Sequence, residues 1–120
     1  MPANRYDLKQ LIYLIKDNKE FDANLILDEG CSIDTEDPKP LIKSLNYLIN
    51  YLKPLTQSPL EISLDLRGKD CLLSLMAYSN AADLPEMSEQ LDETLKVYNA
   101  TKNVIHEKDK YIQIKLSFVK

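Results

Sequence analysis

The chain has 120 residues, of which 44% are hydrophobic and 28% are charged, and its formal net charge is −4. This composition describes one soluble globular domain that is large enough to bury a core. The acidic balance argues against a nucleic-acid-binding surface, which is normally basic. No apolar run approaches the roughly 20 residues of a membrane-spanning helix, and the N-terminus lacks the apolar core of a signal peptide. We therefore expect a single cytoplasmic domain over residues 1–120, with no nucleic-acid or membrane partner.

The first half of the chain predicts two amphipathic helices with a strand between them. We expect a helix over residues 7–18, a strand over 21–27, a polar loop over 30–40 and a second helix over 38–53. Asp7 supplies an acidic cap to the first helix, where apolar residues recur at i, i+3, i+4 and i+7. Pro38 and Pro40 suit the start of the second helix, and Pro54 ends it.

The second half predicts a hairpin, a long helix and a closing strand. Strict alternation indicates a strand over residues 60–66, followed by a turn over 67–70 and a return strand over 71–78. Apolar residues then recur at helical spacing over residues 86–107. No Gly or Pro follows Pro85, which favours one long helix, although two helices stay open. These apolar residues are Met87, Leu91, Leu95, Tyr98 and Ile105. Alternation returns over 111–119, where Ile112, Ile114, Leu116 and Phe118 share one face.

The expected order is α-β-α-β-β-α-β. Four half-apolar strands need cover on one face only, and three amphipathic helices can supply it, which gives a two-layer α/β sandwich of the α+β class. A ferredoxin-like sheet contains the order β-α-β-β-α-β as well, so the order of elements leaves both arrangements open.

The cysteines and acidic residues give no pattern of a metal site. Cys31 and Cys71 are far apart, and two free thiols fit a cytoplasmic protein better than a disulfide does, although one disulfide stays open. One His and two Cys provide no ligand spacing for zinc. The acidic residues of the loop over 28–37 lack the regular spacing of a calcium loop. We expect neither a metal nor a cofactor.

Asn46 and Asn50 are the most distinctive polar residues of the chain. They lie one helical turn apart, so both amide groups project from one side of the second helix. A buried amide without partners costs roughly 1–3 kcal/mol, so the two residues should flank the apolar stripe rather than join it. They are either edge residues that touch solvent or a loop, or paired ligands.

Residues 46–53 (NYLINYLK) resemble the asparagine box in the ATP-binding catalytic domain of bacterial sensor histidine kinases, which are ATPases of the GHKL (Bergerat) type. The first helix and the loop over 33–37 resemble the same domain, and the resemblance runs almost from end to end. It implies a histidine-kinase-like ATPase fold. It also implies that Asn50 would hold the magnesium of Mg-ATP and that Lys53 would approach the phosphates.

The nucleotide motifs of that family are degraded in this chain. After the hairpin the kinases carry an Asp-x-Gly-x-Gly loop, but Ser79 stands here at the adenine-binding Asp, and Ala81 and Asp83 stand at the glycines. Tyr51 occupies a position where the family has a small residue. The flexible lid and the second glycine box are also missing, and the whole chain contains two glycines. The resemblance implies at most a degenerate nucleotide site made of Asn46, Asn50, Lys53 and Ser79, with no catalytic residue.

His106 lies at the expected end of the long helix. There it would favour the helix dipole when protonated, whereas a phosphoacceptor role would need an exposed helical position. The second interpretation would make the chain a fragment of a histidine phosphotransferase.

The favoured hypothesis is a non-catalytic histidine-kinase-like domain that acts as a protein-interaction or regulatory module in a two-component phosphorelay, with no enzymatic activity. By analogy with degenerate relatives, its partner would be a response-regulator-like receiver, and the chain would be a monomer or a weak homodimer. The alternative is a residual adenine-nucleotide-binding domain or weak ATPase. A nucleotide binder should leave an open cleft beside Asn50, whereas an interaction module should fill it with Tyr51, Tyr78 or the long helix.

Overall fold

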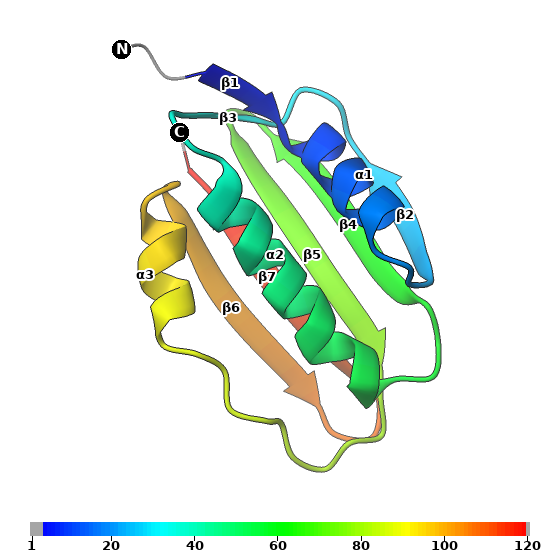
Figure 1. Cartoon of the computed structure of the whole chain (residues 1–120). Coiled ribbons are helices and arrows are strands. Elements are labelled where there is room, and N and C mark those ends of the chain that lie inside the picture. Colours follow the sequence, from blue (N-terminus) through cyan, green and yellow to red (C-terminus); the bar gives the residue numbers. More distant parts are fainter. Residues whose placement is uncertain (1–3, 120) are drawn as a thin grey trace.

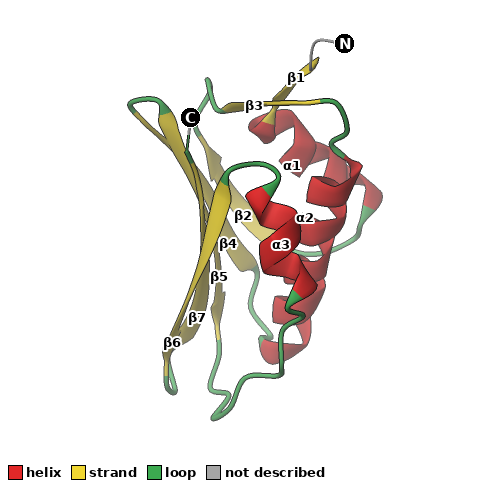
Figure 2. Cartoon of the chain, turned by 90° about the vertical axis from the view of Figure 1, so that its left-hand side faces the viewer, coloured by secondary structure: helices red, strands yellow, loops and turns green. Residues whose placement is uncertain are grey.

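The computed structural model describes residues 4–119. Within them, three helices pack on one face of a five-stranded sheet, and a small two-stranded sheet lies at one end (Figures 1 and 2). The elements in chain order are β1 (Asn4–Asp7), α1 (Leu8–Asn18), β2 (Ala23–Leu27), β3 (Ser32–Thr35), α2 (Lys39–Leu52), the 3-10 turn η1 (Lys53–Leu55), β4 (Leu60–Arg67), β5 (Asp70–Tyr78), α3 (Gln90–Lys96), β6 (Ala100–Glu107) and β7 (Tyr111–Phe118). The predicted two-layer α/β sandwich is confirmed.

The main sheet has the strand order β2-β4-β5-β7-β6. β2 runs parallel to β4, as a strand-helix-strand crossover through α2 requires. The other neighbouring pairs are antiparallel: β4–β5 and β6–β7 are hairpins, and β5 pairs with β7, which follows α3 and β6 in the chain. The β4–β5 turn is the predicted one, and its two-residue loop places Gly68 at φ 63°, a conformation that glycine adopts without strain.

Apolar residues of the helices and of the alternating strands meet in one core. Asp7 caps α1 by accepting a hydrogen bond from the backbone of Lys9 at 2.9 Å, and the helix then buries the four apolar residues predicted from their spacing. On β7, the predicted inner face is fully buried. Figure 2 shows all three helices on the same side of the sheet, so within residues 4–119 no helix covers the other face.

Two of the predicted elements are wrong in extent. The loop over 30–40 contains β3, which pairs antiparallel with β1 in the small sheet. The long helix over 86–107 is instead the short helix α3 followed by the strand β6. The chain turns between them at Asn99, whose φ of 57° lies in the left-handed region that Asn tolerates better than most residues.

The prediction of two free thiols is also wrong. Cys31, just before β3, and Cys71, in β5, form a disulfide, with their Cα atoms 5.9 Å apart. Both are buried in the core. They are 40 residues apart in the sequence, and the fold brings them together because β3 crosses the end of the sheet where β5 begins.

Candidate functional site

α2 carries the residues of the predicted asparagine box. Its apolar stripe, formed by Leu41, Leu45, Leu48, Ile49 and Leu52, is buried. Asn46 is half-buried at the edge of this stripe, and Asn50 is exposed one turn later. Lys53 follows directly after α2, and its Nζ donates to the backbone carbonyl of Glu20 at 3.5 Å. Asn46 and Asn50 therefore lie along α2, and Lys53 begins the turn η1 that follows it.

The segment over residues 79–89, here called the strap, connects β5 to α3 (Figure 1). Two tyrosines of α2 bind its backbone. The Tyr51 hydroxyl donates to the carbonyl of Pro85 at 2.6 Å, and the backbone N–H of Ser88 donates to the Tyr47 hydroxyl at 2.8 Å. The strap is thus fixed to α2 at two points, by side chains one helical turn apart.

Tyr51 is half-buried under this contact. Burial, with a smaller contribution from the neighbouring Tyr47, raises the pKa of the Tyr51 phenol above its ordinary value. The phenol therefore stays protonated at neutral pH and keeps the hydrogen atom that it donates to Pro85.

β6 holds the strap from the other side. The Nζ of Lys102 lies 3.3 Å from the Met87 sulfur and 3.4 Å from Oδ1 of Asp92, and the Nε2 of His106 lies 3.1 Å from the carbonyl oxygen of Ala81. The Met87 and Leu84 side chains pack against the core. The strap consequently has contacts with both α2 and β6, and its apolar side chains fill space between these elements.

The predicted position of His106 is therefore wrong. His106 lies in β6 opposite Ile112 of β7, not at a helix end, and it is half-buried. Its imidazole contacts a backbone carbonyl of the strap. The exposed helical position that a phosphoacceptor would need is not the position that His106 has.

Ser79 is separated from the asparagines. It is buried, and its Oγ accepts a hydrogen bond from the backbone of Ala81 at 3.1 Å. It lines a polar hollow of about 390 Å³ with Tyr78 and Lys110, whereas Lys53 lines a different hollow of about 260 Å³ beside Phe21. The four predicted ligand residues do not converge on one shared cavity, because Lys53 and Ser79 face different ones.

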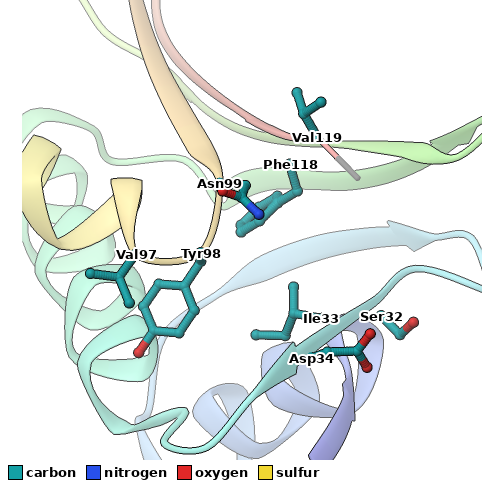
Figure 3. Close-up of a pocket in the computed structure, with 8 residues that line it drawn as sticks. All are labelled: Ser32, Ile33, Asp34, Val97, Tyr98, Asn99, Phe118 and Val119. Atoms are coloured by element: carbon teal, nitrogen blue, oxygen red, sulfur yellow. The ribbon is translucent and has the colours of Figure 1, made fainter. Parts of the chain in front are cut away.

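A further cavity, of about 220 Å³, lies at the opposite end of the molecule. Figure 3 shows it between β3 and the turn that follows α3. Ile33, Tyr98 and Phe118 provide an apolar lining, and Asp34 and Asn99 add polar groups. Sequence reasoning did not indicate this cavity, because its walls come from three segments that are distant in the sequence.

The described part of the chain offers no site for a metal ion. Among residues 4–119, no three His, Cys, Asp or Glu side chains gather in a way that could hold a cation. The acidic loop residues have other contacts: Asp28 accepts from the backbone of Leu66, and Asp34 pairs with Arg5. In the same range, no helix is both long enough and apolar enough to cross a membrane.

Polar side chains around α2 and the strap thus bind the chain's own backbone rather than converge on an open site. The sequence indicated Tyr51 as a residue that could fill a ligand space. The sequence did not indicate the contact between Lys102 and Met87, because both residues were predicted to lie in one long helix.

No protein-family profile matches the sequence, and no curated protein matches it. Solved structures do. The histidine kinase domain of the Escherichia coli osmosensor EnvZ matches with a TM-score of 0.78 and 8% identity, over 98% of this chain and 89% of that one. The catalytic domain of histidine kinase ThkA matches with a TM-score of 0.73 and 12% identity, over 100% of this chain and 97% of that one. The Acinetobacter baumannii histidine kinase AdeS matches with a TM-score of 0.68 and 13% identity, over 100% of this chain and 70% of that one.

These likenesses show the fold. The chain has the histidine-kinase-like ATPase fold that its asparagine-box helix suggested, and the ferredoxin-like alternative is wrong.

Proposed function

We propose that the chain is a non-catalytic histidine-kinase-like domain that works as a protein-interaction or regulatory module. One observation carries this proposal: the Tyr51 hydroxyl binds the Pro85 carbonyl at 2.6 Å. By resemblance, position 51 belongs to a small residue beside the nucleotide. Here an aromatic side chain occupies it and holds the strap, so the chain itself occupies the place where the kinases would hold adenine.

The chemistry of the strap supports the same conclusion. Phosphate groups are bound by backbone N–H groups of glycine-rich loops or helix starts. Between Ser79 and Glu89 the sequence has no glycine, and the Ser88 N–H already donates to Tyr47. Lys53, the cation expected at the phosphates, is directed to the carbonyl of Glu20. A triphosphate would find few free donors and little compensating charge.

The biological setting follows by analogy with the solved structures, which are histidine kinases. We place the module in a two-component phosphorelay, with a response-regulator-like receiver as its partner and as a monomer or weak homodimer. By the same analogy we propose that it works in the cytoplasm. The Cys31–Cys71 disulfide tests that location, because disulfides persist mainly in oxidising compartments. Thiol trapping in intact cells should find both cysteines reduced if the protein is cytoplasmic, and paired if it is not.

The direct test of the non-catalytic assignment is phosphate release from Mg-ATP by the purified chain and by Asn50→Ala. We expect no release above the buffer control from either protein. A rate that the wild type shows and Asn50→Ala loses would identify a working ATPase and overturn the proposal.

The partner is tested by binding of purified receiver domains to the immobilised chain, with nucleotide absent. Failure of every receiver encoded in the same genome would contradict the phosphorelay assignment while leaving the ATPase result independent.

A further inference from the structure

β2 is an edge strand of the main sheet, and one of its two sides faces β4. The carbonyl of Asp22 accepts from the N–H of Leu60 at 2.9 Å, and the N–H of Asp28 donates to the carbonyl of Leu64 at 2.8 Å. The backbone groups of successive residues in a strand point to opposite edges. The even-numbered residues from 22 to 28 therefore direct their backbone toward β4, and the odd-numbered residues between them direct theirs outward. The outward residues are Ala23, Leu25 and Leu27.

The outer edge of β2 is unpaired. Each of the three outward residues contributes one N–H and one C=O group, and among residues 4–119 none of these six groups has a hydrogen-bond partner. Such an unpaired row is a template for another strand. The opposite edge of the sheet, β6, is protected: α3 packs against it, and its Lys102 and His106 side chains contact Asp92 of α3 and the strap. Of the two edges, β2 is thus the accessible one.

β2 also lacks the features that usually block an edge strand. Its sequence, ANLIL, contains no proline and no charged side chain, whereas natural edge strands commonly carry Lys or Pro. Ala23, Leu25 and Leu27 pack against the core, so Ile26 lies on the opposite face of the sheet, where it is 72% exposed. An apolar side chain therefore borders the edge on the face of the sheet away from the helices.

On the helical face, α1 borders the same edge. The Lys9 Nζ lies 3.5 Å from Oε1 of Glu29, and the Lys16 Nζ donates to the carbonyl of Phe21 at 2.9 Å. Glu29 and Phe21 flank β2 in the sequence, so this side of α1 faces β2, and both of its lysines are already paired. Tyr13 lies between the two lysines on the same side of the helix and is 39% exposed. The unpaired edge therefore has a partly exposed aromatic ring beside it.

We propose that β2 pairs with β2 of a second copy of this chain, antiparallel and about a two-fold axis at Leu25. Leu25 then lies opposite Leu25 of the second copy, and Ala23 lies opposite Leu27. Each of the three residue pairs exchanges two hydrogen bonds, and the resulting six bonds satisfy every outward group of both copies. A slip of one residue would place these groups opposite groups already bonded to β4, and a slip of two would leave some of them unpaired.

A second copy is the complementary occupant because the strand fits itself. A contact about a two-fold axis needs a self-complementary surface. Here the small Ala23 meets the larger Leu27 on the helical face, and Asn24 meets Ile26 on the other face. The axis is perpendicular to the sheet, so the two sheets join edge to edge and keep their helices on one face. Burial of Ile26 and Tyr13 beside the junction adds apolar contact.

Two features keep this contact weak. The strands are five residues long, so their pairing buries less than the roughly 1,200 Å² at the lower end of stable interfaces. Asp22 and Asp28 are exposed and lie one residue beyond the two ends of β2, where Asp22 of one copy meets Asp28 of the other. Like charges directly opposite each other are destabilising, so the dimer should form only at high chain concentration. This self-association goes beyond the proposed function and holds whether or not the chain binds ATP.

Sedimentation equilibrium of the full chain from micromolar to millimolar concentration tests the pairing. The wild type should show a monomer–dimer equilibrium. Ile26→Glu should weaken the dimer by about tenfold, because the new carboxylate lies diagonally across from its own copy and from Asp22. Asp22→Asn should strengthen the dimer severalfold, because it removes both like-charge pairs. Val97→Glu is the matched control, since Val97 is 73% exposed and lies directly after α3, and this variant should dimerise like the wild type.

A wild type that stays monomeric up to millimolar chain would overturn the proposal, as would equal weakening by Ile26→Glu and Val97→Glu. An Asp22→Asn variant that dimerises no more tightly than the wild type would contradict the proposed register.

Hydrogen exchange of the wild type tests the same contact without a variant. The outward amides of residues 23, 25 and 27 should exchange more slowly as the chain concentration rises. The amides of Asn24 and Ile26 pair with β4 and should be protected at every concentration. A dimer whose outward amides continue to exchange at the rate of the monomer would place the contact elsewhere and overturn the proposal.

Discussion

Tyr98 connects the turn after α3 to the start of α2. Its hydroxyl donates to the carbonyl of Asp37 at 2.8 Å and accepts from the backbone N–H of Leu41 at 3.2 Å. The N-cap residue of α2, Pro38, has no capping side chain. Instead, the Asp37 side chain accepts a hydrogen bond from the N–H of Lys39, and the Tyr98 hydroxyl accepts one from the N–H of Leu41. Pro40, between them, has no N–H to donate. A buried phenol from another element thus completes the cap.

We predict that Tyr98→Phe lowers the free energy of unfolding by about 1–3 kcal/mol, because it leaves a buried N–H and a carbonyl without their partner. Urea denaturation measures the change. Tyr13→Phe is the control, since Tyr13 is 39% exposed. A loss for Tyr98→Phe no larger than that for Tyr13→Phe would mean that the cap has no energetic role.

Burial also makes Tyr51 and Tyr98 sensitive to alkaline pH. It raises the pKa of both phenols in the folded protein, and Asp37 adds to the effect at Tyr98. The neutral form is thus favoured by folding. The stabilisation is complete below the unfolded pKa of about 10 and is lost as pH rises through the higher folded values. The free energy of unfolding of the wild type should fall above about pH 10. That of the double variant Tyr51→Phe with Tyr98→Phe should fall less over the same pH range. Parallel curves for both proteins would exclude these phenols as the cause.

At the scale of elements, patterns of period 2 were reliable. Residues 60–66 and 111–119 alternate and form β4 and β7 almost as predicted, and Asp7 caps α1 where expected. β6 was missed because Leu91, Leu95, Tyr98 and Ile105 fit a helical period by coincidence. The break comes from Asn99, which takes the left-handed conformation without a glycine. β1 and β3 were missed because each is four residues long and is defined by pairing with the other.

The strap should behave as a fixed element rather than as a mobile loop. The Ser88 amide donates to the Tyr47 hydroxyl. Tyr47→Phe removes that acceptor, worth about 0.5–1.5 kcal/mol, so hydrogen exchange at Ser88 should become roughly 2- to 13-fold faster. Tyr13→Phe should leave this amide unchanged. If Ser88 exchanges at the rate of an unprotected amide in the wild type already, the strap is not fixed.

The disulfide couples the small sheet to the main sheet. Cys31 and Cys71 close a segment of 40 residues, for which the chain-entropy estimate gives about 4 kcal/mol of stabilisation. We predict that a dithiol reductant lowers the unfolding midpoint of the wild type in guanidinium. The double variant Cys31→Ala with Cys71→Ala should have a low midpoint with or without reductant. A wild-type unfolding midpoint that is the same with and without reductant would contradict a stabilising role of the disulfide.

Across the whole molecule, the fold could be recognised from sequence but the arrangement of the site could not. The asparagine-box helix is a local pattern, so Asn46 and Asn50 could be placed on α2 before its surroundings were known. The strap depends on contacts such as Tyr51 to Pro85, 34 residues apart, and Lys102 to Met87, across a predicted helix that does not exist. Ser79 was assigned by its place in a degraded motif, and it faces a different hollow from Lys53.

The central claim is that the chain keeps the kinase fold with its nucleotide place filled by its own side chains. Calorimetric titration of Mg-ATP and Mg-ADP into the wild-type chain, Tyr51→Ala and Asn50→Ala tests it most directly. We predict no saturable heat for any of the three proteins up to millimolar nucleotide. Saturable binding to the wild type that disappears in Asn50→Ala would contradict the claim and establish a working nucleotide site.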